Sequence, residues 1–293
     1  MAQTAVSLPA RVEAAGPVAT FWRRFRRSRL AVVALLFLVL VHVLGAAAPV
    51  VAPYPPEEVD LTRRLAPPGA GHWLGTDENG RDVFSRLIYG ARVSLLVGLL
   101  SAVVAVAVGT VVGAVGGYFG GVTDAILMRL TDGMMILPTF FLALLVLAVF
   151  GPGIINLIAV IGLTSWMGVA RVVRGEVLRT RPQEFVLAAR ALGAGNARIL
   201  AVHVLPQAAP AIIVATTLGT AQAILTESAL SYLGLGIQPP TPTWGNMLAS
   251  AQHFLWVRPE LAVYPGILIL LTVLAYNSVG DALRDALDPF MKE

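Results

Sequence analysis

The chain has 293 residues, of which 57% are hydrophobic and only 13% are charged. A soluble domain has about 25% charged and roughly 45–50% apolar residues, so this composition excludes a water-soluble globular protein and a disordered chain. There are no cysteines, which excludes a disulfide framework, a thiolate metal site and a cysteine nucleophile. What the net charge of +4 indicates, nucleic-acid binding or membrane topology, depends on where the charged residues lie.

Long stretches of the chain contain no Asp, Glu, Lys or Arg, and a bilayer core takes about 20 residues of helix. One stretch, 133–170, is long enough for two helices, and Gly151-Pro152-Gly153 divides it. We therefore predict an all-α membrane protein with six transmembrane helices. The predicted helices cover residues 30–52, 93–116, 136–150, 154–173, 206–226 and 262–280.

The first apolar segment follows an arginine-rich stretch, so a signal peptide cleaved near Ala46-Ala47-Ala48 is the competing interpretation. The segment is longer than the usual 7–15-residue core of a signal peptide, which favours a retained anchor. With the N-terminus inside, the segments predicted inside hold 15 basic residues and those outside hold 6. Cytoplasmic loops carry this excess, so 1–29 and 283–293 are predicted to be cytoplasmic tails. The six outside are Arg63, Arg64, Arg81, Arg86, Arg92 and Arg258.

Three longer segments connect the predicted helices. Residues 53–92 and 227–261 are predicted outside, where their Pro and Gly residues favour turn-rich structure and their length is too small for an independent core. Residues 93–282 form the predicted five-helix core. Within it, the segment 174–205 is predicted inside and helical, and a structured loop of that length is usually functional.

The residues of an active site are missing. No histidine pair has the HExxH spacing of a zinc site, and Ser165 and Ser231 lack the surroundings of a nucleophile elbow. Lys292 is the only lysine, so a Gly-Lys-Ser/Thr phosphate loop cannot occur. We therefore predict no catalytic residue, no metal site and no cofactor in this chain. Because the arginines follow the edges of apolar segments, nucleic acid is not an expected partner.

Two sets of residues within the predicted helices point to contacts in the membrane. Gly109, Gly113 and Gly117 recur every four positions, and small residues on one helix face allow another helix to approach closely. We expect them to pack in the bundle, with a sliding surface as the alternative. Thr216, Thr220 and Glu227 also share a face. One interpretation is that the threonine hydroxyls only bond to the backbone of their own helix. The other, which is our hypothesis, is that this face lines a substrate path.

The predicted inner loop has a pattern of its own. Ala188-Ala189 favours a helix with a low-profile surface that fits a groove of another protein. Gly193 suits the end of that helix, and Pro206 suits the first turn of the next. The pattern predicts a short helix, a turn and a second helix with one docking side.

This loop resembles the EAA motif of bacterial importer permeases, E-A-A-x3-G-x9-I-x-L-P. Leu187 stands at the Glu position and His203 at the Ile position. The residues that match are Ala188, Ala189, Gly193, Leu205 and Pro206. Further segments resemble the C-type permease subunits of dipeptide, oligopeptide and nickel importers, namely 72–95, 116–121, 233–245 and 280–289.

The resemblance implies the type I ABC importer permease fold in a bacterial inner membrane. It implies a homologous B-type permease, two cytoplasmic ATPase subunits that bind ATP and Mg, an external substrate-binding protein and surrounding lipid. Di- or oligopeptides are the expected cargo; nickel, glutathione or another small solute is the alternative, and a non-transporting scaffold or sensor is the alternative of another class. The residues expected in the coupling loop are Glu184, Leu187, Ala188, Ala189, Arg190, Gly193, His203, Leu205 and Pro206.

Overall fold

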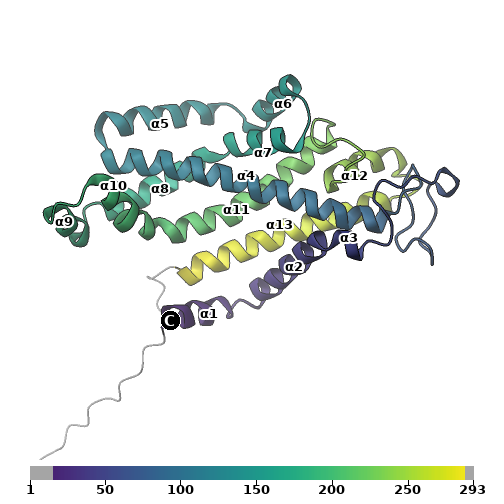
Figure 1. Cartoon of the computed structure of the whole chain (residues 1–293), viewed down its shortest axis with the longest axis horizontal. Coiled ribbons are helices and arrows are strands. Elements are labelled where there is room, and N and C mark those ends of the chain that lie inside the picture. The colour runs from purple at the N-terminus through teal and green to yellow at the C-terminus, as the bar shows by residue number, and fades with distance from the viewer. Residues whose placement is uncertain (1–15, 288–293) are drawn as a thin grey trace, which may run out of the picture.

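The computed structural model describes residues 16–287, and within this range the chain forms a bundle of helices with no β-strand (Figure 1). Arg11, Lys292 and the ends of both predicted tails lie outside the described residues. The helices are α1 (Pro17–Phe25), α2 (Arg29–Ala46), α3 (Ala48–Val51), α4 (Val83–Phe119), α5 (Gly121–Ile136), α6 (Thr139–Phe150), α7 (Ile154–Leu163), α8 (Trp166–Thr180), α9 (Glu184–Ala191), α10 (Asn196–Arg198), α11 (Leu205–Tyr232), α12 (Trp244–Ala251) and α13 (Glu260–Leu287).

Four of these helical stretches are long and apolar enough to cross a membrane: α2, α4, Asn196–Tyr232 and α13. Two bent pairs, α5 with α6 and α7 with α8, meet the same criteria when each pair is taken together. Six spans result if each bent pair is one span. This agrees with the predicted all-α membrane protein with six transmembrane helices.

The bundle has two ends, because its long helices run along one direction (Figure 1). Helix α1, helix α9 and the last turns of α13 lie together at one end, called here the α9 end. Residues 52–82 and helix α12 lie at the opposite end, called the α12 end. The segment 174–205 and the described parts of both predicted tails therefore lie toward one end of the bundle, and 53–92 and 227–261 gather at the other. Helix α5, which falls between the second and third predicted helices, runs along the bundle beside α4 instead.

Helix α4 starts ten residues before the predicted 93–116 helix, at Val83. The Asp82 carboxylate caps it by accepting a hydrogen bond from the Ser85 backbone N–H at 2.7 Å, which satisfies one of the free amides of a helix start. Arg86 and Arg92 lie inside the helix. The apolar stretch begins only after these charges. A helix start predicted from the charge-free stretch therefore falls ten residues too late.

The third span also differs from the predicted 136–150 helix. Helix α6 alone has 12 residues, about 18 Å at 1.5 Å per residue, which is too short to span a bilayer. Helix α5 precedes it, and the two are bent by 81° at Pro138, which cannot donate a helical hydrogen bond. The acids of α5 are paired with α8: Asp124 bonds Arg174 twice at 2.6 Å, and Asp132 bonds Arg171 at 2.5 Å.

The fourth span is bent by 43° between α7 and α8. The Thr164 hydroxyl donates to the Val160 carbonyl at 2.8 Å, and hydroxyls that bond to their own helix in this way often bend it. The fifth and sixth helices extend past the predicted 206–226 and 262–280 at both ends.

The three predicted packing glycines of α4 face α8. A Cβ atom at Gly113 would lie 2.3 Å from the Ala170 carbonyl oxygen, and one at Gly109 would lie 2.6 Å from the Val169 Cβ. At Gly117 the nearest atom would be the Arg174 carbonyl oxygen, at 3.0 Å. The two backbones are therefore in direct contact over two turns of α4.

We expect Gly113→Ala to destabilise the protein by about 1–3 kcal/mol, because the added methyl group forces α4 and α8 apart. Gly175→Ala in α8 is the matched control, since a Cβ there meets no atom within 4 Å; it should be neutral or stabilising by up to about 1 kcal/mol. Thermal denaturation of the purified chain in detergent measures both. Equal behaviour of the two variants would contradict the close contact.

Candidate functional site

The predicted helix–turn–helix of the inner loop lies at the α9 end. Helix α9 ends at Ala191, and Gly193, two residues further on, has φ 83°, a left-handed conformation that glycine adopts without strain. The Gly193 and Ala194 N–H groups donate to the carbonyls of Arg190 and Ala189 at 3.0 and 3.1 Å, which closes the helix end. Helix α10 follows, and a wide π-helical turn, Ile199–Val204, carries it into α11. The stretch Asn196–Tyr232 is thus one helical rod of 37 residues, about 55 Å long.

One side of this loop is anchored to the bundle. Val186, Ile199 and Val204 are fully buried in a cluster with residues of α4 and α8. Tyr118, near the end of α4, donates a hydrogen bond to Asn196 Oδ1 at 3.0 Å and accepts one from Arg190 Nη2 at 3.3 Å. The loop is therefore fixed to the ends of α4 and α8.

The other side of α9 is an exposed apolar face. Phe185, Ala188 and Leu192 are spaced three and four residues apart, so they share one face of the helix, and all three are exposed. Leu192 is 89% exposed. Sequence reasoning missed Phe185 and Leu192, although the helical period counted back from Gly193 places both of them beside Ala188.

The structure distributes the other predicted loop residues over both sides. Ala189 is half-buried and packs on the anchored side, so the paired alanines do not point the same way. His203 and Leu205 are also half-buried. The exposed residues are Glu184, Leu187, Arg190 and Pro206.

The predicted polar face of α11 lies mostly inside the chain. The hydroxyl groups of Thr216 and Thr220 donate to the carbonyls of Ile212 and Thr216, each at 2.8 Å. Thr220 is 1% exposed. These bonds satisfy the hydroxyls within their own helix, the first of the two interpretations given above. A role of these residues in a substrate path stays a prediction.

Glu227 is fully buried in a cage of hydroxyl groups. Its Oε2 accepts from Ser94 Oγ at 3.1 Å and from Ser228 Oγ at 3.3 Å, and its Oε1 accepts from Ser231 Oγ at 2.8 Å. Ser94 Oγ in turn accepts from the Trp244 backbone N–H at 3.2 Å. The cage therefore joins α4 to α11 and to the first residue of α12, both of which lie more than 130 residues further along the sequence.

A further polar side chain of α11 faces outward. Gln222 is exposed although it lies within the charge-free stretch of the span, two residues past the buried Thr220. Thr226, one turn further on, donates to the Gln222 carbonyl at 2.9 Å. Polar side chains at this depth face water or protein rather than lipid. The sequence signal is an isolated Gln in an apolar segment, off the helix face that Thr216, Thr220 and Glu227 share.

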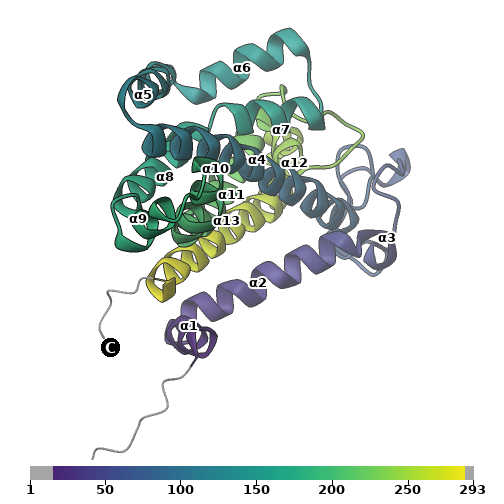
Figure 2. The same cartoon turned by 60° about the vertical axis from the view of Figure 1, so that its left-hand side comes forward.

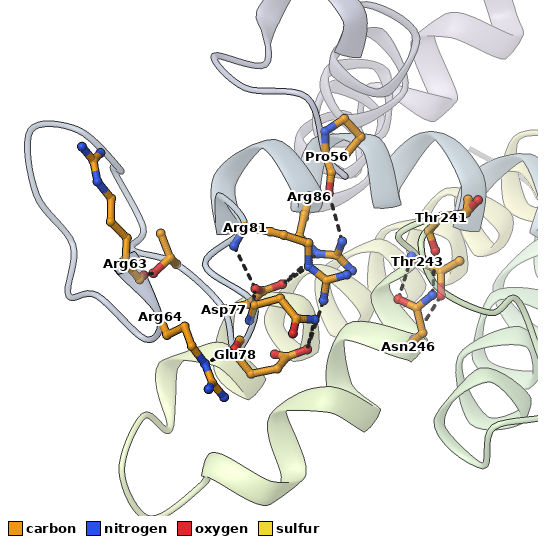
Figure 3. A network of polar contacts seen from close by, with 12 residues as sticks. Pro56, Arg63, Arg64, Asp77, Glu78, Arg81, Arg86, Thr241, Thr243 and Asn246 are labelled. Carbon is orange, nitrogen blue, oxygen red and sulfur yellow. Dashed lines mark hydrogen bonds and ion pairs between the residues drawn. The ribbon is translucent and has the colours of Figure 1, made fainter. Parts of the chain in front are cut away.

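Buried charges hold residues 52–82 against the start of α4 at the α12 end (Figure 3). Asp77 Oδ2 lies 2.7 Å from Arg81 Nε and 3.3 Å from Arg86 Nε. Arg81 Nη2 also reaches Glu78 Oε1 at 3.0 Å, and Arg86 Nη1 donates to the Pro56 carbonyl at 3.0 Å. Because each charge has a partner, the segment is fixed rather than loose.

The other loops at the α12 end are equally ordered. Thr243 and Asn246 cap α12 reciprocally, each side chain accepting from the other's backbone N–H at 3.0–3.1 Å (Figure 3). Arg258 donates to the carbonyls of Leu65 and Ala66, so the α12–α13 connection is tied to residues 52–82. This end of the molecule therefore presents one preformed surface.

The architecture defines a class: a multi-span membrane protein with an anchored helical loop exposed at one end and a rigid surface at the other, as in a transport permease. Within the described residues no group of three His, Cys, Asp or Glu side chains could hold a metal ion. Residues 105–293 match the family described as the binding-protein-dependent transport system inner membrane component. Residues 16–68 match the N-terminal transmembrane domain of oligopeptide transport permease C.

Curated relatives resemble nearly the whole chain. A glutathione transport system permease protein, GsiD, of Shigella flexneri is 45% identical over 273 residues, 93% of this chain and 90% of that protein. A di/tripeptide transport system permease protein, DppC, of Pseudomonas aeruginosa is 43% identical over 282 residues, 94% of this chain and 93% of that protein.

The chain belongs to the binding-protein-dependent transport system inner membrane component family. It is a permease subunit of an ABC importer, as the resemblance of its inner loop implied. A permease of this kind works with a second permease, a binding protein and separate ATPase subunits that hydrolyse ATP.

Replacing Glu227 tests the hydroxyl cage. Glu227→Ala leaves three buried hydroxyls without their acceptor and should cost about 2–5 kcal/mol of stability. Glu227→Gln keeps one acceptor oxygen and should cost less. Thr226→Val, which removes only a bond to its own helix, should stay within about 0.5 kcal/mol. Thermal denaturation in detergent is the measurement, and a Glu227→Ala variant as stable as Thr226→Val would show that the cage does not stabilise the fold.

Proposed function

We propose that this chain forms half of the membrane path of a peptide importer and that its α9 loop receives the motion of an ATPase subunit. The observation that carries the proposal is the apolar face of Phe185, Ala188 and Leu192 on a helix whose other side is anchored. Exposed leucine and phenylalanine side chains at the tip of a structured loop indicate a protein partner.

The proposed orientation places the α9 end in the cytoplasm. The segments predicted inside hold 15 basic residues and those predicted outside hold 6, the excess that marks cytoplasmic loops; of the 15, Arg11 and Lys292 lie outside the described residues. Both termini are then cytoplasmic, and the α12 end faces the external binding protein. ATP and Mg belong to the two ATPase subunits, because this chain has no phosphate-binding lysine.

The proposed coupling follows from the continuity of the loop with α11. When ATP closes the ATPase dimer, the docked face of α9 is displaced, and the rod Asn196–Tyr232 carries that displacement across the membrane. The bundle then alternates between its inward-facing and outward-facing states. ATP drives this change only if the ATP-bound ATPase dimer fits one state better than the other.

We place the solute path along the exposed side of α11, at the contact with the homologous B-type permease. Gln222 supplies both a donor and an acceptor, which suits the amide groups of a peptide. Di- and tripeptides are the proposed cargo because the relatives include a di/tripeptide permease. Glutathione is the second candidate, favoured by the glutathione permeases, and it too presents amide groups.

The double variant Ala188→Asp/Leu192→Asp tests the docking face. Two carboxylates on an apolar contact should lower the amount of ATPase that co-purifies with the permease pair by about tenfold or more, because their desolvation opposes binding. Ala70→Asp, an exposed alanine at the α12 end, is the control and should leave the amount unchanged. A full complement of ATPase on the double variant would refute docking at this face.

Gln222→Leu tests the path. In proteoliposomes that contain the whole importer and its binding protein, the initial rate of dipeptide uptake should fall severalfold, whereas Gln222→Asn, which keeps the amide, should retain most of it. If Gln222 faced lipid instead, the leucine variant would keep the wild-type rate and melt at a higher temperature, and the assignment would be wrong.

A further inference from the structure

Helix α1 lies across the bundle at the α9 end. Figure 2 views it almost end-on, while α2 and α13 run across the picture, so α1 turns away from the direction of the spans. Phe25 is 3% exposed and packs with Ala31 of α2 and with Ala282 and Ala286 of α13. Phe21 packs beside it, 6.1 Å from the Phe25 ring. The inner side of α1 is thus fixed to the last turns of α13.

The outward side of α1 and the start of α2 combines arginines with an exposed indole ring. Five of the seven residues 23–29 are arginine, and Arg26, Arg27 and Arg29 are exposed. Trp22 is 43% exposed, with the Arg26 guanidinium 5.6 Å from the centre of its ring. Tryptophan and arginine together are typical of the level of the lipid headgroups.

The charge at this place is strongly positive. No acidic residue occurs in the sequence between Glu13 and Glu57. The neighbouring turns of α13 contribute Asp281, Asp285 and Arg284, all exposed. Among the described residues, the exposed Arg26, Arg27, Arg29 and Arg284 outnumber the exposed Asp281 and Asp285 by four to two.

The depth of these arginines follows from the helix that comes next. Leu30, Val33 and Leu36 are each 64–68% exposed on α2, an apolar surface that only lipid or another apolar surface can cover. This surface begins at the residue after Arg29. The arginines consequently lie at the boundary between acyl chains and water, where the phosphate groups of phospholipids are found.

We propose that α1 and the first turn of α2 form a binding surface for anionic phospholipid headgroups. Arg26, Arg27 and Arg29 contact the phosphate groups, and Trp22 enters the interface beside them. A second protein is the weaker fit, because the arginine surface continues without a break into the lipid-facing side of α2. Because Phe25 fastens α1 to α13, a bound headgroup also fixes the end of the last span. The proposal concerns the lipid and not the cargo, so its failure would leave the proposed transport function standing.

The test uses the purified full-length chain in an uncharged detergent, titrated with fluorescent phosphatidylglycerol and, separately, with the matching phosphatidylcholine. The wild-type chain should bind phosphatidylglycerol about tenfold or more tightly. Arg26→Gln/Arg27→Gln should lose about tenfold in that affinity, and Arg26→Lys/Arg27→Lys should retain it. Arg63→Gln/Arg129→Gln removes the same charge elsewhere and should bind as the wild type does.

Several results would overturn the proposal. Equal affinity of the wild-type chain for the two lipids would do so without any variant. Unchanged binding by Arg26→Gln/Arg27→Gln, or an equal loss in the Arg63→Gln/Arg129→Gln control, would place the lipid elsewhere. Displacement of the lipid by millimolar inorganic phosphate would show a site for free phosphate instead. Circular dichroism melts of each variant confirm that the chains compared are folded.

Discussion

The direct contact between the backbones of α4 and α8 is the constraint on which the rest of the bundle depends. Lipid is as apolar as a leucine side chain, so helices in a membrane associate through close packing rather than through the hydrophobic effect. Gly113 allows that packing because it has no Cβ to meet the Ala170 carbonyl. Helices α2, α5, α7, α11 and α13 all contact α4, whereas α6 contacts α7. The base of the α9 loop rests on the same two helices.

Two buried side chains, Tyr118 and Glu227, fix the helices at the two ends of the molecule, and one long helical stretch connects these ends. At the α9 end, Tyr118 holds the loop to α4, so the exposed face of α9 has a fixed orientation. At the α12 end, Glu227 joins α4, α11 and α12. The helical rod between Asn196 and Tyr232 connects the two ends. In the proposed coupling, a displacement of α9 would reach the α12 end through this single helical rod.

The composition and the order of the residues were sufficient for the class, the number of spans and the local form of the loop. The length of an apolar segment, the helix preference of Ala188-Ala189 and the left-handed turn at Gly193 each depend only on residues that are neighbours in the sequence. The limits of the helices were less predictable. Helix α5 was missed because Asp124 and Asp132 were counted as charges, whereas arginines of α8 pair with both. The cost of a charge in a span depends on its partner, and the partner lies some 40–50 residues away.

The sequence by itself thus determined that this is a six-span membrane protein of the importer-permease class with a helix–turn–helix loop, because those signals reside in neighbouring residues. Only the tertiary structure decided which sides of the helices are used. It turned Ala188 outward and Ala189 inward, enclosed Glu227 among serines from two helices, and left Gln222 exposed. The physical reason is that the surroundings of a side chain are set by helices that meet in space, and helical period alone does not say which face meets them.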